Sequence, residues 1–217
     1  MASPCVSIER IVLGPIDNNV YLIGDGSSMV LVDPSCREKD ILAFLDGRMP
    51  DAIFVTHAHY DHIGALAALR AATGAPVYAS AAEEPLINGS NPSWNSRHGV
   101  EPCPVDYVVS DGDVLAIGNM MWKAMITPGH SQGSTCFLLE NVRACGVEDS
   151  SASILVSGDT LFEGTIGRTD FEGGDFQAMR RSLARLAALQ DETIVLPGHG
   201  NPTTIDAERI RVFKRYC

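Results

Sequence analysis

The stretch THAHYDHIG, from Thr56 to Gly64, constrains this chain more than any other feature of its sequence. It places three of the chain's six histidines and an aspartate within six positions, directly after the apolar run AIFV. A short apolar run predicts a buried strand, so the polar cluster is expected in the loop beyond that strand. Crowded groups that can carry charge disfavour one another's charged forms unless something compensates them. The stretch therefore indicates a site for a positive ion.

Three further strand ends carry residues of the same kinds. KAMIT leads into His130, ILVSG leads into Asp159, and TIVL leads into His199. In sheets covered by helices, sites form in the crevice beyond the carboxyl ends of the strands, so we expect these side chains to converge. Five of the six histidines then belong to one site, and only His98 is left out.

The residues at the four strand ends are those that bind metal ions. Neutral imidazole and carboxylate ligands suit zinc, iron and manganese. Five histidines and two aspartates are too many for one tetrahedral ion, but they suit two ions that share a bridging ligand, about 3.5–4 Å apart. The Gly- and Pro-rich sequence around them allows tight turns. The expected ligands are His57, His59, Asp61, His62, His130, Asp159 and His199.

The rest of the chain predicts an alternation of short strands and helices. A stretch rich in Gly, Pro, Asn and Ser, residues 88–104, predicts a long loop. The helix expected over 175–190 places Phe176, Met179, Leu183 and Leu186 on one apolar face. Strands are expected at 6–14, 18–25, 28–34, 51–56, 75–80, 121–127, 134–140, 153–158 and 193–196, and the other helices at 37–47, 62–74 and 205–213.

Composition limits the class of protein. A length of 217 residues with 45% hydrophobic and 20% charged residues is typical of one globular domain, expected over 1–217. The net charge of -11 argues against binding to nucleic acid or an anionic membrane. The sequence shows neither a run of eighteen apolar residues nor the pattern of a signal peptide. Six scattered cysteines without a CxxC pair argue against a disulfide scaffold and fit a reducing compartment, so a cytoplasmic location is expected.

The order H-x-H-x-D-H, T-P-G-H, S-G-D and P-G-H resembles the metallo-β-lactamase superfamily, over nearly the whole chain from NNVYLIGD to LPGHGNPTT. The resemblance implies an α/β fold, a four-layer αβ/βα sandwich with its metal site at one edge of the two sheets. It implies two divalent metal ions, with zinc expected and iron or manganese as alternatives. Carried over by position, one ion is held by His57, His59 and His130, the other by Asp61, His62 and His199, and both by Asp159.

A second motif, GDTLFEGTIGRTDFEGGD from Gly158, resembles the glyoxalase II-like hydrolases and also the persulfide dioxygenases. It implies a hydrolase of a small-acid thioester, similar to hydroxyacylglutathione hydrolase, with esters as further substrates. Only 18 residues follow His199, so a short form without the helical C-terminal extension of glyoxalase II is expected. The alternatives are a dioxygenase with a single iron at His57, His130 and Asp159, and a metal-binding protein without turnover.

Asp61 is the expected catalytic residue, placed to orient the nucleophile or to take its proton, and a purely coordinating role is the alternative. Arg168 and Asp170 are candidate substrate-binding residues. The planar guanidinium of Arg168 suits a substrate carboxylate, whereas an ion pair between the two residues is the other reading.

Three further residues each have two readings. Asp33 either hydrogen-bonds a ligand loop or starts a turn before Pro34. Trp94 and His98 either form a lid or are ordinary residues of the long loop. A small molecule is the expected partner, and the sequence makes no prediction of the oligomeric state.

Overall fold

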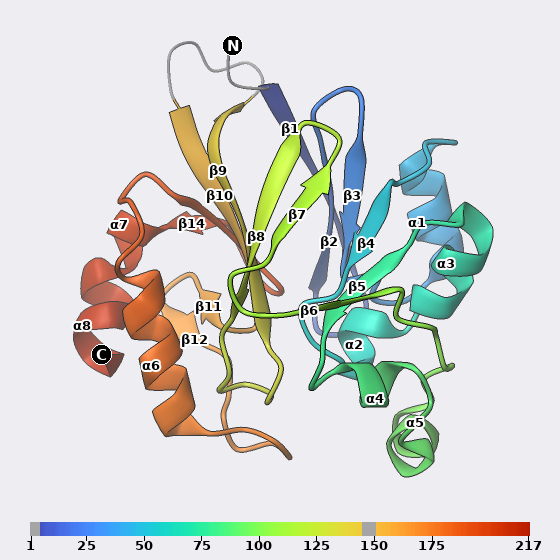
Figure 1. Cartoon of the computed structure of the whole chain (residues 1–217). Coiled ribbons are helices and arrows are strands. Elements are labelled where there is room, and N and C mark those ends of the chain that lie inside the picture. The colour runs from blue at the N-terminus through green and yellow to red at the C-terminus, as the bar shows by residue number, and fades with distance from the viewer. Residues whose placement is uncertain (1–4, 145–150) are drawn as a thin grey trace.

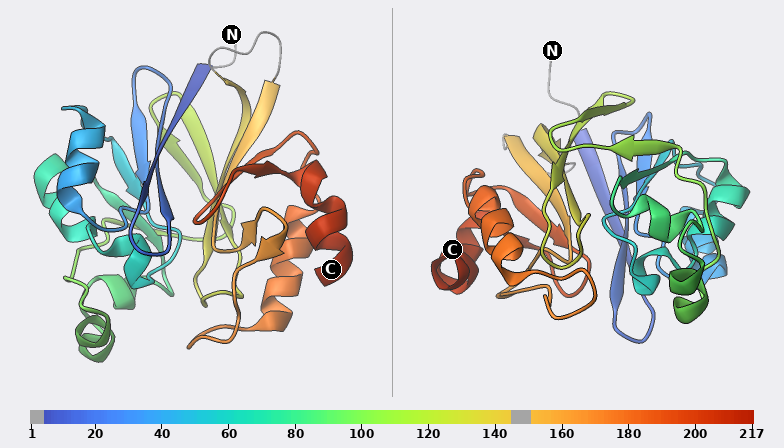
Figure 2. Two further views of the ribbon diagram at one scale, coloured as in Figure 1. Left: turned by 180° about the vertical axis from the view of Figure 1, so that it is seen from behind. Right: turned by 60° about the horizontal axis from the view of Figure 1, so that its bottom comes forward.

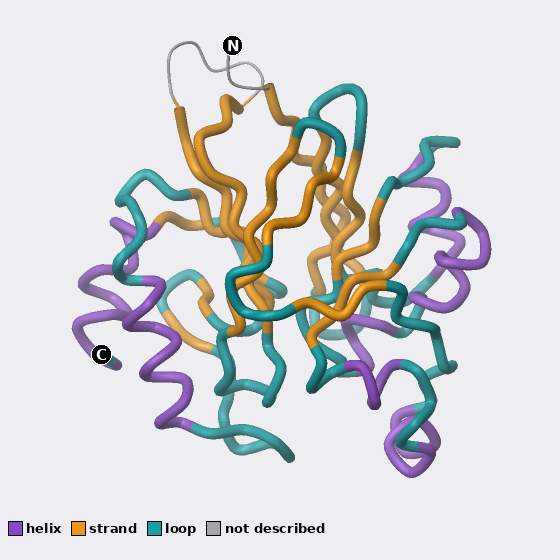
Figure 3. The backbone as a smooth tube through the Cα atoms, in the orientation of Figure 1, coloured by secondary structure: helices purple, strands orange, loops and turns teal. Residues whose placement is uncertain are grey.

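Two β-sheets face each other in the computed structural model, which describes residues 5–144 and 151–217. Helices cover the outer face of each sheet, so the layers run helix, sheet, sheet, helix (Figures 1 and 3). Figure 2 shows that the helices of the first half of the chain lie on one side and those of the second half on the other. The predicted αβ/βα sandwich is confirmed.

The first sheet has six strands in sequence order. β1, β2 and β3 are antiparallel neighbours, and β3 to β6 are parallel. The strands are β1 (Cys5–Leu13), β2 (Asn18–Gly24), β3 (Met29–Val32), β4 (Ala52–Phe54), β5 (Val77–Ser80) and β6 (Tyr107–Val109).

The second sheet has the order β7-β8-β9-β10-β13-β14, in which only β10 and β13 pair in parallel. A short parallel pairing of β1 with β9 joins the two sheets. A separate two-stranded ribbon is made of β11 (Leu161–Phe162) and β12 (Thr165–Ile166). The strands of the second sheet are β7 (Val114–Ile117), β8 (Met120–Ile126), β9 (Thr135–Ala144), β10 (Ser151–Gly158), β13 (Ile194–Pro197) and β14 (Thr203–Thr204).

The helices are short, and most lie in the connections between strands. Those of the first half are α1 (Glu38–Leu45), α2 (Tyr60–Ile63), α3 (Leu66–Thr73), α4 (Glu84–Ile87) and α5 (Pro92–His98). Those of the second half are α6 (Phe176–Leu186), α7 (Ile205–Glu208), the π-helical turn η1 (Arg209–Phe213) and α8 (Lys214–Tyr216).

The core has three apolar layers because successive side chains of a strand point to opposite faces of its sheet. In β2, Leu22 lies in the cluster that includes Ile41 of α1, whereas Ile23 lies in the central cluster with Trp122 of β8. The third cluster joins the outer face of the second sheet to Leu183 of α6. This packing fixes both sheets relative to each other and therefore fixes the loops at their edges.

Two predicted elements are wrong in detail. The helix expected over 62–74 is divided at Gly64, where a Cβ atom would lie 2.5 Å from the carbonyl oxygen of Ser35. Phe176 does not share the buried face of α6, since 44% of its surface is exposed and its ring instead contacts Tyr216 edge-on. Burial of Met179, Leu183 and Leu186 agrees with the prediction.

The loop expected over 88–104 is also wrong, because it contains α5. The side chain of Asn91 accepts a hydrogen bond from the backbone N–H of Trp94, Pro92 occupies the first turn, and Gly99 ends the helix at φ 63°. Asn, Pro and Gly thus act as helix caps here rather than as loop residues. The short strands β6, β7, β11, β12 and β14 were not predicted.

Strand β9 continues to Ala144, beyond the strand expected at 134–140, and residues 145–150 lie outside the described residues. Cys36, Cys103, Cys136 and Cys217 are free, whereas Cys5 is disulfide-bonded, a bond that was not predicted. Among the described residues, none of the helices has the length and apolar character needed to cross a membrane.

Candidate metal centre

The loops after β4, β8, β10 and β13 meet at one edge of the two sheets. The backbone N–H of Thr135, beside the end of β8, donates to the carbonyl of Thr56 at 2.9 Å. The N–H of Gly198 donates to the carbonyl of Gly158, also at 2.9 Å. These bonds tie the loops of both sheets together, so that all seven predicted ligands are brought into one cluster.

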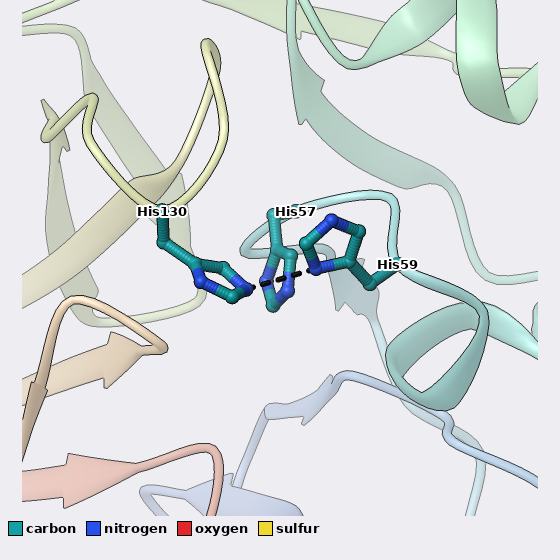
Figure 4. A group of neighbouring side chains, drawn as sticks. All are labelled: His57, His59 and His130. Carbon is teal, nitrogen blue, oxygen red and sulfur yellow. Dashed lines mark hydrogen bonds between the residues drawn. The ribbon is translucent and has the colours of Figure 1, made fainter. Parts of the chain in front are cut away.

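His57, His59 and His130 form the first group of the cluster, with ligand atoms within 4.8 Å of one another. Figure 4 shows the three rings turned toward a common centre, His57 and His59 from the loop after β4 and His130 from the loop after β8. Nε2 of His130 lies 2.8 Å from Nδ1 of His59. These two nitrogens face the same point, so both can bind one cation placed there.

Asp61, His62 and His199 form the second group, within the same 4.8 Å limit. Oδ2 of Asp61 lies 3.4 Å from Nε2 of both His62 and His199. Asp159 lies between the groups, since its Oδ2 is 3.4 Å from Nε2 of His130 and its Oδ1 is 3.4 Å from Nε2 of His62. This is the position that a bridging carboxylate requires.

His130, His199 and His62 each have a partner on the far side of the ring that fixes its orientation. Nδ1 of His130 donates to the carbonyl of Arg168 at 2.7 Å, and Nδ1 of His199 donates to the carbonyl of Ile16 at 2.9 Å. Such outer contacts set the tautomer and leave Nε2 free to face a metal ion.

Asp33 orients His62 in the same way, by accepting from its Nδ1 at 3.0 Å. The buried Asp33 carboxylate also accepts from the backbone N–H and the hydroxyl of Thr56, at 2.8 and 2.7 Å. Of its two readings, the hydrogen bond to a ligand loop is therefore the one observed.

Three buried atoms of the cluster have no hydrogen-bond partner among the described residues: Nε2 of His57, Nε2 of His62 and Oδ1 of Asp159. Buried polar atoms are normally paired, and each unpaired one costs about 1–3 kcal/mol. The three residues also form one of the groups whose ligand atoms lie within 4.8 Å. Their unpaired atoms fit a site that is completed by metal.

The protonation states of His57, His59 and Asp61 agree with this fit, whereas at His62 and His199 burial lowers the pKa but the nearby carboxylates raise it by more. Burial, together with His130, lowers the pKa of His59 to about 3, and burial lowers the pKa of His57 well below its ordinary value. Both rings are therefore neutral, which is the form that binds metal. Burial alone would raise the pKa of Asp61, but the nearby rings of His199 and His62 and the hydrogen bond from Asn18 lower it by more, so the carboxylate is ionised.

Gly198, in the P-G-H motif that ends at His199, is required for steric reasons. A Cβ atom on Gly198 would lie 2.3 Å from Oδ1 of Asp159 and 2.7 Å from Cε1 of His62. Any side chain at this position would displace two residues of the cluster, so only glycine lets β13 deliver His199 so closely.

Sequence reasoning missed two residues that hold the ligand loops. Glu83, 1% exposed, accepts from the backbone N–H of Ala58 at 2.8 Å, the hydroxyl of Ser131 at 2.7 Å and the N–H of Gly133 at 2.8 Å. It thereby links the loop after β4 to the loop after β8. Asn18 donates to Oδ2 of Asp61 at 3.0 Å. No sequence signal marks either residue, because their partners are distant along the chain.

A cavity of about 630 Å³ opens beside the cluster, lined by side chains of both groups. Its other described lining residues come from the turn after β1, from α2, from α5 and from segments after β10: Ile16, Tyr60, Trp94, Arg97, His98, Phe162, Arg168, Phe171 and Glu172. Trp94 and His98 thus form a wall of the cavity on a helix, rather than belonging to a loop. The volume is that of a site for a small molecule.

Arg168 lines the cavity, but its guanidinium is already paired. Its Nε and Nη2 donate to the two carboxylate oxygens of Asp170, at 2.7 and 2.8 Å, and the group lies 3.8 Å from the centre of the Phe171 ring. The ion pair between the two residues, one of the two readings of the sequence, is present. A contact of either residue with substrate stays a prediction.

The His98→Ala protein is expected to keep its full metal content. The His98 ring stacks on Tyr60 and contacts Trp94, with centroid distances of 6.1 and 4.2 Å, and it belongs to none of the candidate ligand groups. Elemental analysis of the purified variant checks this, and loss of metal would show that His98 is a ligand.

Comparison with known proteins agrees with this geometry. Residues 13–199 match the model of the metallo-beta-lactamase superfamily. The chain is 34% identical to the probable metallo-hydrolase YqgX of Bacillus subtilis over 207 residues, 93% of each chain. It is 26% identical to the hydroxyacylglutathione hydrolase GloC of Haemophilus influenzae, over 94% of this chain and 95% of that one. The crystal structure of TTHA1623 in a di-iron-bound form matches with a TM-score of 0.76 and 34% identity, covering 94% of this chain and 98% of the other. The chain belongs to the metallo-beta-lactamase superfamily.

Proposed function

We propose that this chain is a single-domain, metal-dependent hydrolase that cleaves a thioester of a small acid at a centre of two divalent ions. The observation that carries the proposal is Asp159, which lies between two groups of candidate ligands and has one buried oxygen without a hydrogen-bond partner among the described residues. The relatives named as a metallo-hydrolase, a hydroxyacylglutathione hydrolase and a di-iron protein support it. Zinc is the metal that we propose, with iron or manganese as alternatives, and the proposed location is the cytoplasm.

In this proposal, the first ion is held by His57, His59 and His130, the second by Asp61, His62 and His199, and both by Asp159. Bound metal ions supply Lewis-acid polarisation of the carbonyl and lower the pKa of water from 15.7 to about 7. The protein's own part is to hold the ligands, to exclude solvent with the cavity walls and to place Asp61. Its ionised carboxylate, held by Asn18, orients the attacking water or accepts its proton.

Arg168 and Asp170 complete the proposed substrate site at the rim of the cavity. Arg168 lines the cavity, and Asp170 holds its guanidinium in place. The carbonyl of Arg168 also orients His130, so this segment connects the substrate site to the metal ligands.

Metal analysis and activity together test the proposal. Protein purified without added metal is expected to contain two divalent ions per chain and to hydrolyse acyl thioesters. Dialysis against a chelator abolishes the hydrolysis, and zinc restores it. If the protein binds two ions but hydrolyses neither thioesters nor esters, the proposal is wrong and the protein binds metal without turnover.

The second candidate is an iron-dependent persulfide dioxygenase, which the motif from Gly158 also resembles, and the di-iron relative supports iron as a metal for such a site. Two histidines and one carboxylate are a known ligand set for non-haem iron. His57, His130 and Asp159 would supply that set here. One iron per chain, with oxygen uptake on addition of a persulfide and no thioester hydrolysis, would select this function instead.

A further inference from the structure

We infer that the part of the cavity between α5 and residues 168–172 binds an uncharged, apolar group of the substrate, an aromatic or branched acyl chain beside the scissile thioester. The inference rests on the proposed function and names its substrate class. Three features carry it: the wall formed by α2 and α5, the opposite wall, and the pairing of both arginines in the cavity.

The first wall is a stack of rings on α2 and α5. His98 lies between Tyr60, with rings nearly parallel at 6°, and Trp94, with ring centroids 4.2 Å apart. Trp94 in turn stacks on His59 at 6.1 Å. These rings therefore extend from Tyr60, which is 48% exposed, to His59, a candidate metal ligand, so that a ring bound against them would lie next to the metal centre.

The opposite wall is also apolar. The ring of Phe171 lies 5.7 Å from that of His59, and the ring of Phe162 lies 5.9 Å from that of His199. Ile16, in the turn after β1, adds an apolar side chain that is half exposed. Tyr60 and Phe171 remain 48% and 44% exposed, so a bound apolar group would cover surface that water now contacts.

The cations in the cavity have acidic partners. Arg97 donates to Glu172 at 3.1 Å, and this pair connects α5 to the segment before α6. Arg168 is held by both oxygens of Asp170 and rests on Phe171. A carboxylate on the acyl group, or on a glutathione leaving group, would compete with Asp170 or Glu172 for these two guanidinium groups. An uncharged group displaces neither.

A matched pair of substrates tests the inference. The phenylacetyl and succinyl thioesters of N-acetylcysteamine share an uncharged leaving group and differ in the charge and ring of the acyl group. The metal-loaded protein is expected to show a kcat/KM at least tenfold higher for the phenylacetyl thioester, since ring contacts and burial of a ring are together worth about that factor. Equal values, or a preference for the succinyl thioester, would overturn the inference.

Three variants locate the preference. Trp94→Ala is expected to lower the ratio of the two kcat/KM values about tenfold. Phe176→Ala is the matched control, because this exposed aromatic residue lies outside the cavity lining, and its ratio should equal that of the parent. Arg168→Ala is expected to lower both values by the same factor. A loss confined to the succinyl thioester would show that Arg168 binds a carboxylate and would contradict an uncharged substrate.

A binding measurement separates this inference from the proposed function. The chain has two tryptophans, Trp94 in the cavity wall and Trp122 fully buried in the core. Phenylacetamide, which is uncharged and is not a thioester, is expected to quench tryptophan fluorescence in the parent but not in Trp94→Phe. Quenching without thioester hydrolysis would support the apolar site and refute the proposed function. Hydrolysis with neither quenching nor acyl preference would refute the apolar site alone.

Discussion

The His57→Ala and His130→Ala proteins are expected to bind metal at least a hundredfold more weakly than the parent and to lose hydrolytic activity in proportion. Loss of even an outer partner of a ligand typically costs 10- to 100-fold in metal affinity, so loss of a ligand itself should exceed that range. Isothermal titration with zinc and elemental analysis of the purified variants measure the effect. The His98→Ala protein is the matched control, as a histidine of the same cavity that is in no ligand group.

Two further variants test whether the centre holds two ions. His199 belongs to one candidate group, so His199→Ala is expected to retain one ion per chain. Asp159 lies between both groups, so Asp159→Ala is expected to weaken both ions. Saturation of the parent protein at one ion, with His199→Ala unchanged, would contradict the two-ion centre and favour the iron dioxygenase.

Glu83→Ala is expected to lower the free energy of unfolding by about 3 kcal/mol or more. The substitution leaves the buried N–H groups of Ala58 and Gly133 without an acceptor, at about 1–3 kcal/mol each, and it removes one partner of the Ser131 hydroxyl, which keeps the hydroxyl of Ser134. It also releases the loops after β4 and β8 from each other, so zinc affinity should fall about 10- to 100-fold. Urea denaturation and zinc titration measure the two effects.

Glu83→Gln and Glu84→Ala distinguish this role from general damage to α4. Glutamine keeps one oxygen to accept a hydrogen bond but turns an NH₂ group toward the other donors, so it should recover only part of the stability. Among the described residues, the side chain of Glu84, the neighbouring acid, is hydrogen-bonded to Asn88 alone, so Glu84 is expected to tolerate alanine within about 0.5 kcal/mol. Equal losses in Glu83→Ala and Glu84→Ala would exclude a specific role for the Glu83 carboxylate.

The sandwich and the clustering of the seven residues were predictable because residues that can bind metal stand directly after apolar strands in the sequence. His57, His130, Asp159 and His199 each follow an apolar strand, and strands of one sheet edge must end near one another. Glu83 could not be found in this way. Its importance comes from three donors on two loops, and those contacts exist only after β5 has brought the chain to the same edge.

Helix α5 was missed for a different reason. Asn, Pro and Gly stand at both ends of a seven-residue segment, and the same residues signal a loop or a helix cap depending on what lies between them. The segment PSWNSRH has too few apolar residues to show a helical period. Its helix is set by the caps and by the packing of Trp94, which is 7% exposed.

The crossover from β5 to β6 contains α4 and α5 but none of the seven clustered residues. The two strands pair directly with each other, so the sheet can form with different sequences in the segment between them. Connections that leave and re-enter a scaffold in this way tolerate insertion and substitution better than the scaffold itself. During evolution, a chain of this kind can therefore change the cavity wall that this crossover forms. The loops that carry the candidate metal ligands lie on other segments and are selected separately. The distal half of this crossover is where an engineer should randomise the sequence to change what the protein accepts, with Glu83, at its proximal end, left untouched.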